Sequence, residues 1–257
     1  MAARSCVLFV TTAEQPPRAA LQRAQELADR AQSELRVLRV LSERQLSSAP
    51  VMRFVEAVRA TSRHCRDALA DRYADDRLAL VTGTLSEAAA SHAVENDAAL
   101  LILPAGELRG RDVTALARAT GLPVMVLRPA PREVRLILAA TDLTRPDYPV
   151  LRSARALAAL RGCQVLALHA FRRRRLAAEC RAKLQRAARV LGLDDAVLLS
   201  TRDATSAILA EAHERAADVI VVGTHTRTAL GRAVRSSVAA KLIDRTHGSV
   251  WVEPIAG

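Results

Sequence analysis

The residues most suggestive of chemistry lie near the C-terminus, in a polar loop that follows a short apolar run. The run stops at Gly223, His225 and Thr226 come next, and Ser236 and Ser237 precede a segment of helical character. In open α/β sheets, ligands bind beyond the carboxyl ends of the strands, and the free N–H groups at a helix start favour an anion. The pattern therefore predicts a phosphate-binding loop.

Two other loops would meet this one if the apolar runs before them are neighbouring strands. Thr141 and Asp142 follow one such run, and Ala170 follows another. A carboxylate such as that of Asp142 accepts hydrogen bonds from a ribose hydroxyl or from an adenine edge. Together with Val222 and Val238, which flank the loop, these residues predict a nucleotide site at one edge of a sheet.

The elements that would position these loops occur twice along the chain of 257 residues. Residues 77–106 align with residues 196–225, and both segments read as strand, turn, amphipathic helix and strand. Short continuous apolar runs are typical of parallel strands that are buried on both faces. We therefore expect two tandem α/β domains, each an open five-stranded parallel sheet of Rossmann-like type.

The boundary between the two copies is expected near Pro129 and Pro131. This gives domains at residues 1–130 and 131–257. The second copy has six more residues than the first between its last two predicted strands, and they fall in the loop that carries Thr226 and Ser236. The first copy has Ala13 at the position aligned with Asp142. We therefore predict that the first copy has no nucleotide site.

Charge is distributed unevenly over the two copies. The net charge of the chain is +11, and residues 131–257, with 21 Arg and Lys against 12 acids, contribute most of it. The segment Phe171–Val190 collects basic residues on one expected helix, which is either a solvated face or a surface for an anionic partner such as nucleic acid or lipid. Only six residues are aromatic (3 Phe, 1 Trp, 2 Tyr), which argues against single-strand binding by stacking.

Other function classes leave no pattern in the sequence. It contains no G-x-S-x-G, G-x4-G-K-[ST] or H-E-x-x-H motif and no paired His/Cys spacing, so we predict no catalytic and no metal-ligating residues. The four cysteines are expected to be reduced, buried thiols. No apolar run is long enough for a spanning helix or an export signal, which favours a cytoplasmic protein.

The second copy resembles a universal stress protein domain, and the whole chain resembles a tandem two-domain member of that family. The resemblance rests on the run Asp218–Gly223, on the TDLT segment Thr141–Thr144, and on Leu168–Ala170. It rests also on the family pattern G-x2-G-x9-G-[ST], which here reads Gly223, x2, Thr226, x9, Ser236, Ser237, with Thr and Ser in place of the two inner glycines.

The resemblance implies an adenine-nucleotide alpha-hydrolase-like fold and a site for ATP, with Mg²⁺. By this analogy Asp142, beside Thr141, would hold the ribose or adenine, and Ala170 and Val222 would line the base pocket. The phosphates would be surrounded by Gly223, His225, Thr226, Ser236 and Ser237, and Val238 would complete the nucleotide site.

The resemblance also implies stress-response regulation and a pseudo-dimer within one chain, in which Val124–Leu127 pairs with Val250–Glu253. A homodimer of chains remains open. Two other functions stay open as well. One is a slow ATP hydrolase, and the other is a stress scaffold that binds protein or anionic partners without a nucleotide.

Overall fold

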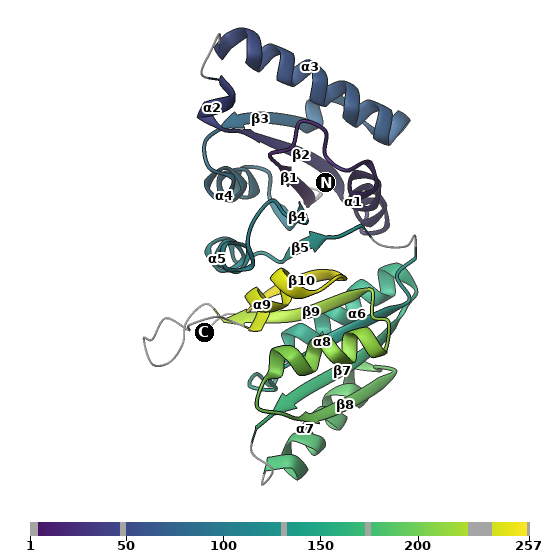
Figure 1. Ribbon diagram of the computed structural model, residues 1–257. Helices are drawn as coiled ribbons and strands as arrows, with labels where there is room; N and C mark the ends of the chain where they lie inside the picture. Colours follow the sequence, from purple (N-terminus) through teal and green to yellow (C-terminus); the bar gives the residue numbers. More distant parts are fainter. Residues whose placement is uncertain (1–4, 47–49, 130–132, 173–175, 226–237, 256–257) are drawn as a thin grey trace. The chain divides into compact units, whose positions relative to one another are not determined.

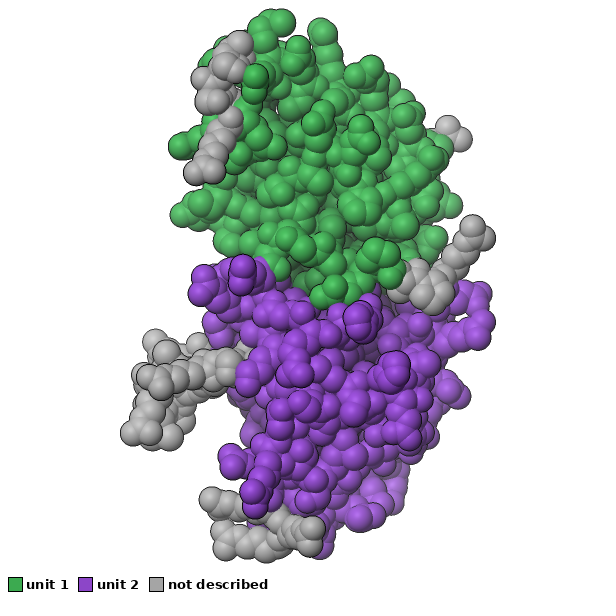
Figure 2. All heavy atoms as spheres, in the orientation of Figure 1, with its two compact units in different colours: residues 1–108, 122–129 green, residues 109–121, 130–257 purple. Residues whose placement is uncertain are grey.

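The computed structural model describes residues 5–46, 50–129, 133–172, 176–225 and 238–255 (Figure 1). The chain forms two compact units (Figure 2). Unit 1 comprises residues 1–108 and 122–129, and unit 2 comprises residues 109–121 and 130–257. Each unit contains one parallel five-stranded sheet with helices between successive strands, so the predicted α/β class is confirmed.

The sheet of unit 1 has the strand order β3-β2-β1-β4-β5. Its strands are β1 (Cys6–Thr11), β2 (Glu34–Leu41), β3 (Leu78–Thr82), β4 (Ala98–Pro104) and β5 (Val124–Leu127). Its helices are α1 (Arg18–Arg30), α2 (Glu43–Leu46), α3 (Pro50–Leu69) and α4 (Leu85–Glu95), with single 3₁₀ turns at Ala70–Arg72 and Asp75–Arg77.

The sheet of unit 2 has the order β10-β9-β6-β7-β8. Its strands are β6 (Leu136–Ala140), β7 (Gln164–Phe171), β8 (Asp195–Ser200), β9 (Val219–His225) and β10 (Ser249–Ile255). Its helices are α5 (Gly110–Thr120), α6 (Pro149–Arg161), α7 (Ala177–Leu191), α8 (Ala204–Glu214) and α9 (Val238–Arg245).

Local sequence accounts for these elements. All residues of β1 are buried, as a strand covered on both faces requires. In α1 the buried residues Ala20, Leu21, Ala24 and Leu27 recur at helical spacing, so one stripe faces the sheet. Thr84 is the N-cap of α4, and its hydroxyl accepts from the Glu87 N–H. Asp203 is the N-cap of α8, and its carboxylate accepts from the Thr205 N–H.

Strand register corrects the sequence alignment of the two copies. Phe9 of β1 pairs with Val37 and Ile102, and Ala139 of β6 pairs with Ala167 and Val221. The turns after β1 and β6 match as well, because Thr11 Oγ1 accepts from the Ala13 N–H at 3.0 Å and Thr141 Oγ1 accepts from the Leu143 N–H at 3.2 Å. Thr11 therefore corresponds to Thr141, and Thr12, not Ala13, stands at the place of Asp142. The alignment from sequence was shifted by one residue, because a uniformly apolar run does not indicate which residue pairs with which.

The same comparison corrects the length of the inserted loop. Ile102 of β4 pairs with Met125, 23 residues later, whereas Val221 of β9 pairs with Trp251, 30 residues later. The second copy thus has seven additional residues between these strands rather than six.

Helix α5 belongs to the first copy in sequence but groups with unit 2. It packs against α9, and a Cβ added to Gly110 would collide with the backbone of Ala240. The Gly110 N–H donates to Asp244 Oδ1 at 2.8 Å. Only glycine allows this close approach of two helices. The predicted domain division at residues 130 and 131 and the predicted pairing of the two last strands stay predictions.

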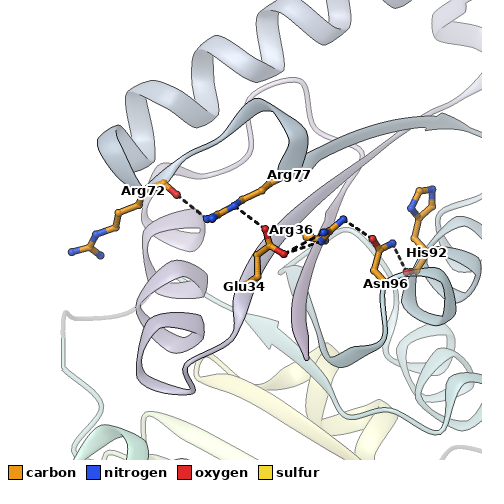
Figure 3. Close-up of polar contacts among 6 residues, drawn as sticks. All are labelled: Glu34, Arg36, Arg72, Arg77, His92 and Asn96. Carbon is orange, nitrogen blue, oxygen red and sulfur yellow. Dashed lines mark hydrogen bonds and ion pairs between the residues drawn. The ribbon is translucent and has the colours of Figure 1, made fainter. Parts of the chain in front are cut away.

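A polar network ties β2 of unit 1 to its neighbours (Figure 3). Glu34 pairs with Arg77 at 2.9 Å and with Arg36 at 3.2 Å, and Arg36 donates to Asn96 Oδ1 at 2.7 Å. Asn96 in turn donates to the backbone oxygen of His92 at 2.8 Å. These contacts fasten the start of β2 to the 3₁₀ turn before β3 and to the end of α4, and they pair the charges of both arginines with Glu34.

All four cysteines are free. Cys6 and Cys65 are buried as predicted, and burial raises the pKa of the Cys65 thiol to about 11. Cys163 and Cys180 are partly exposed, so the prediction of burial was wrong for these two. Cys163 lies in the turn between α6 and β7, and Cys180 lies in the first turns of α7.

Candidate functional site

A cavity of about 240 Å³ opens in unit 2 at the carboxyl ends of β6, β7 and β9. This is the edge at which the sequence predicted that three loops meet. Seven of the residues predicted from the sequence line the cavity: Thr141, Asp142, Ala170, Val222, Gly223, His225 and Val238. The other three, Thr226, Ser236 and Ser237, lie outside the described residues.

The loop after β6 is held in one conformation by short-range hydrogen bonds. The Thr141 N–H donates to Leu168 O at 2.9 Å, and buried His169 donates through Nδ1 to Thr141 O at 2.8 Å. Leu143 adopts a left-handed φ of 58°, and its N–H donates to Thr141 Oγ1 at 3.2 Å. A non-glycine residue in this region costs about 1–2 kcal/mol, so the loop stores strain to aim Asp142.

The carboxylate of Asp142 is partly exposed and connects two loops. Its Oδ1 accepts from the Thr144 N–H at 3.0 Å and from the Thr144 hydroxyl at 2.8 Å. Its Oδ2 lies 2.6 Å from His225 Nε2, at the end of β9. Burial acts to raise the pKa of Asp142, but the Thr144 and His225 hydrogen bonds outweigh it and hold the pKa below its usual value. Because an ionised carboxylate only accepts, the Nε2–H of His225 donates.

Gly223 leaves room for neighbouring side chains at the cavity. A Cβ at this position would collide with the side chain of Ile255 and press on Val150. Both residues are buried and both line the cavity. The glycine therefore allows Ile255 to close the cavity floor, a role that its place in a loop motif does not reveal.

The structure adds cavity residues that the sequence did not indicate. Thr224 is 2% exposed, and its buried Oγ1 has no hydrogen-bond partner among the described residues. Arg118 of α5 also lines the cavity, although it precedes the second copy in the chain. No local pattern marks these two residues, because strand alternation and the packing of α5 bring them there. The remaining wall is made of Ala140, Val150, Leu168, Ala204, Ile208 and Ile255.

The corresponding edge of unit 1 is occupied by a carboxylate of the chain itself. Glu107, just after β4, accepts from the Thr11 hydroxyl, from the Thr12 N–H at 3.0 Å and from the Thr12 hydroxyl at 2.6 Å. The hydrogen-bond donors at the end of β1 are therefore already paired, and the negative charge of Glu107 lies beside them. A phosphate would be repelled at this place.

Other site types find little support in the parts of the chain that the structure describes. Within them, no three His, Cys, Asp or Glu side chains gather in a way that could hold a metal ion. No described helix is both long and apolar enough to cross a membrane.

Comparisons with solved structures show the same architecture along the full chain. A putative universal stress protein from Pseudomonas aeruginosa UCBPP-PA14 is 22% identical, with a TM-score of 0.72 over 98% of this chain and 94% of that one. A protein of unknown function from Pseudomonas aeruginosa PAO1 is 23% identical, with a TM-score of 0.67 over 98% and 93%. A universal stress protein from Archaeoglobus fulgidus is 14% identical, with a TM-score of 0.69 over 95% and 97%. No curated protein matches the chain.

The family model described as the universal stress protein family matches residues 5–128 and 172–254. The two matched segments cover most of the chain and fall on both copies of the repeat. Together with the two parallel sheets, they show that this chain belongs to the universal stress protein family.

Proposed function

We propose that unit 2 binds an adenine nucleotide, with ATP as the expected ligand, and that the protein acts in the stress response through this binding. The observation that carries the proposal is the cavity beyond β6, β7 and β9, which unites seven residues selected from sequence alone. Its walls are mostly apolar, and Asp142 provides one ionised acceptor at its rim. This combination suits an aromatic base with a ribose.

The buried hydroxyl of Thr224 supports a polar ligand. A buried hydroxyl without a partner costs about 1–3 kcal/mol. A ring nitrogen or amino group of a bound base would remove this cost. The hydroxyl both donates and accepts, so it fits either edge of the base.

The size of the cavity limits what it holds. A volume of about 240 Å³ is below the usual range of about 300–1,000 Å³ for sites that enclose a drug-sized ligand. The cavity is therefore suited to the base and ribose, and the phosphates with Mg²⁺ would lie outside it. Arg118 lines the cavity and would offset phosphate charge.

Calorimetric titration of the nucleotide-free protein with Mg-ATP tests the proposal. We expect micromolar binding in the wild type and at least about tenfold weaker binding in Asp142→Ala, because a charge-assisted acceptor is lost. Thr12→Ala is the matched control, since Thr12 occupies the corresponding place in unit 1, and it should leave the affinity unchanged.

Two results would contradict the proposal. One is the absence of heat and of any thermal shift up to millimolar Mg-ATP. The other is binding that Thr12→Ala removes and Asp142→Ala does not. If ATP binds, assay of ADP formation in wild type and Asp142→Ala separates simple binding from slow hydrolysis. If it does not, salt-dependent binding to anionic vesicles or nucleic acid tests the scaffold alternative.

A further inference from the structure

An arginine of unit 1 is buried without full compensation. Arg39, near the end of β2, is 3% exposed. Its Nη1 donates to Thr61 Oγ1 at 2.5 Å and to Ala57 O at 3.3 Å, both on α3. Its Nε is buried and has no hydrogen-bond partner among the described residues. The neutral acceptors on α3 thus bind only the Nη1 of the guanidinium.

The charge of Arg39 also lacks a direct counterion. It forms an ion pair with none of the carboxylates in the described parts of the chain, in contrast to Arg36 on the same strand (Figure 3). Burial lowers the pKa of Arg39, and the charge of Glu14 only partly opposes this effect. Burying an unpaired charge is strongly unfavourable, so such groups in proteins are paired or bind an anion.

Arg39 lines a large cavity that lies within unit 1. The cavity has a volume of about 1050 Å³ and is walled by β2, α2, α3 and the start of β3. Leu41, Leu78 and Val58 give it an apolar side. Four more arginines line it, Arg53, Arg59, Arg63 and Arg66, against the acids Glu14, Glu56 and Asp75. The lining is therefore both apolar and net positive.

Helix α3 covers this cavity only loosely. Figure 1 shows α3 at the end of the unit where β2 and β3 lie. Its buried residues, Thr61, Cys65, Ala68 and Leu69, all belong to its second half. In its first half Val51 and Met52 are 74% and 63% exposed. The helix is thus anchored mainly through its second half, while its first half contributes Arg53, Glu56 and Val58 to the cavity lining.

We propose that this cavity is a second ligand site, which binds a small organic anion through Arg39. The carboxylate or phosphate of the ligand accepts from guanidinium N–H groups of Arg39 that α3 does not use, because charge-assisted hydrogen bonds to an oxyanion are strong. The apolar body of the ligand packs against Leu41 and Leu78. This site lies in unit 1, does not use the nucleotide cavity and does not depend on the function proposed for unit 2.

Three probes that share a phenyl ring test the site in the full-length protein by calorimetry. Benzoate and phenyl phosphate carry the two candidate oxyanions on the same apolar ring, and benzamide is the neutral control. We expect at least one anion to bind about tenfold or more tightly than benzamide. The better of the two anions identifies the head group, and equal affinity means that any oxyanion suffices.

Variants assign the binding to Arg39. Arg39→Met should weaken the binding of the anion by about tenfold or more. Arg36→Met is the matched control on the same strand, and it should leave the affinity unchanged, as should Asp142→Ala in unit 2. Without a ligand, Arg39→Met should be at least as stable as the wild type, because an apolar side chain replaces an uncompensated charge.

The proposal is overturned if no anion binds the wild type or if Arg39→Met binds the anion as well as the wild type. Should Arg39→Met fail to fold, the wild type still decides the question. A crystal of the wild type soaked with 4-iodobenzoate should show anomalous iodine density in this cavity, with the carboxylate on Arg39. Iodine found only elsewhere would refute the site.

Discussion

His225 Nε2 lies 2.6 Å from Asp142 Oδ2, which joins the end of β9 to the loop after β6. The corresponding loops of unit 1 are joined by Thr12 and Glu107, with the carboxylate on the opposite loop. Each unit therefore closes the same edge of its sheet with one polar pair. In unit 2 the carboxylate is that of Asp142, which follows β6 and lines the cavity. In unit 1 it is that of Glu107, which follows β4 and accepts the hydrogen bonds of Thr11 and Thr12.

The stability that Asp142 contributes should depend on pH. Its pKa is lowered in the folded protein, so its contribution is present above the unfolded pKa of about 3.9 and is lost as the pH falls through the folded value. The melting temperature of Asp142→Asn should lie below that of the wild type above about pH 5, and the two should converge as the pH falls through the folded pKa of Asp142. A difference that stays constant with pH would contradict this.

Glu253 should behave in the opposite way. Burial raises its pKa, although the Trp251 N–H and the Ser153 hydroxyl donate to its Oε2 at 2.9 and 2.8 Å. A raised folded pKa means that stability falls as the pH rises from the unfolded pKa of about 4.3 through the folded value. Glu253→Gln keeps an acceptor oxygen and removes the charge, so it should stabilise the protein near pH 7 and have little effect near pH 4. Thermal melts at the two pH values check the sign, and destabilisation near pH 7 would refute it.

The two helix caps should make similar contributions. Thr84 is the N-cap of α4 and Asp203 is the N-cap of α8, at corresponding places in the two units. Thr84→Ala and Asp203→Ala should each cost about 1 kcal/mol in the free energy of unfolding of the unit concerned. The control is Ser91→Ala on the exposed side of α4, with an expected change within about 0.5 kcal/mol. Denaturant titration measures all three, and caps no more costly than Ser91→Ala would argue against this role.

The contact between α5 and α9 should not tolerate a side chain at Gly110. Gly110→Ala places a Cβ against the backbone of Ala240, which cannot move as a side chain end could. We expect a loss of about 1–3 kcal/mol. Arg111→Ala, at the adjacent exposed position, should change the free energy of unfolding by less than about 0.5 kcal/mol. Equal effects of the two substitutions in denaturant titration would show that the helices can separate without cost.

Much of the candidate site was predictable because its signals are local. The apolar run that ends at Gly223 and the Thr141–Asp142 pair after another run both mark carboxyl ends of parallel strands. Parallel topology then brings such ends to one edge of the sheet. The structure places Asp142 and His225 in hydrogen-bond contact, although they are 83 positions apart in the chain.

The sequence by itself determined the α/β class, the two copies of one repeat and the strands that carry the loops. Hydrophobic periodicity is a local property, so it can be identified without knowing the tertiary contacts. Only the tertiary structure decided the register that sets Thr12 at the place of Asp142, the packing of α5 in unit 2, and the burial of Thr224 and Arg39 without full hydrogen bonding. These features depend on which distant residues come into contact. A periodic pattern states which face of an element is buried, and it does not state which partner covers that face.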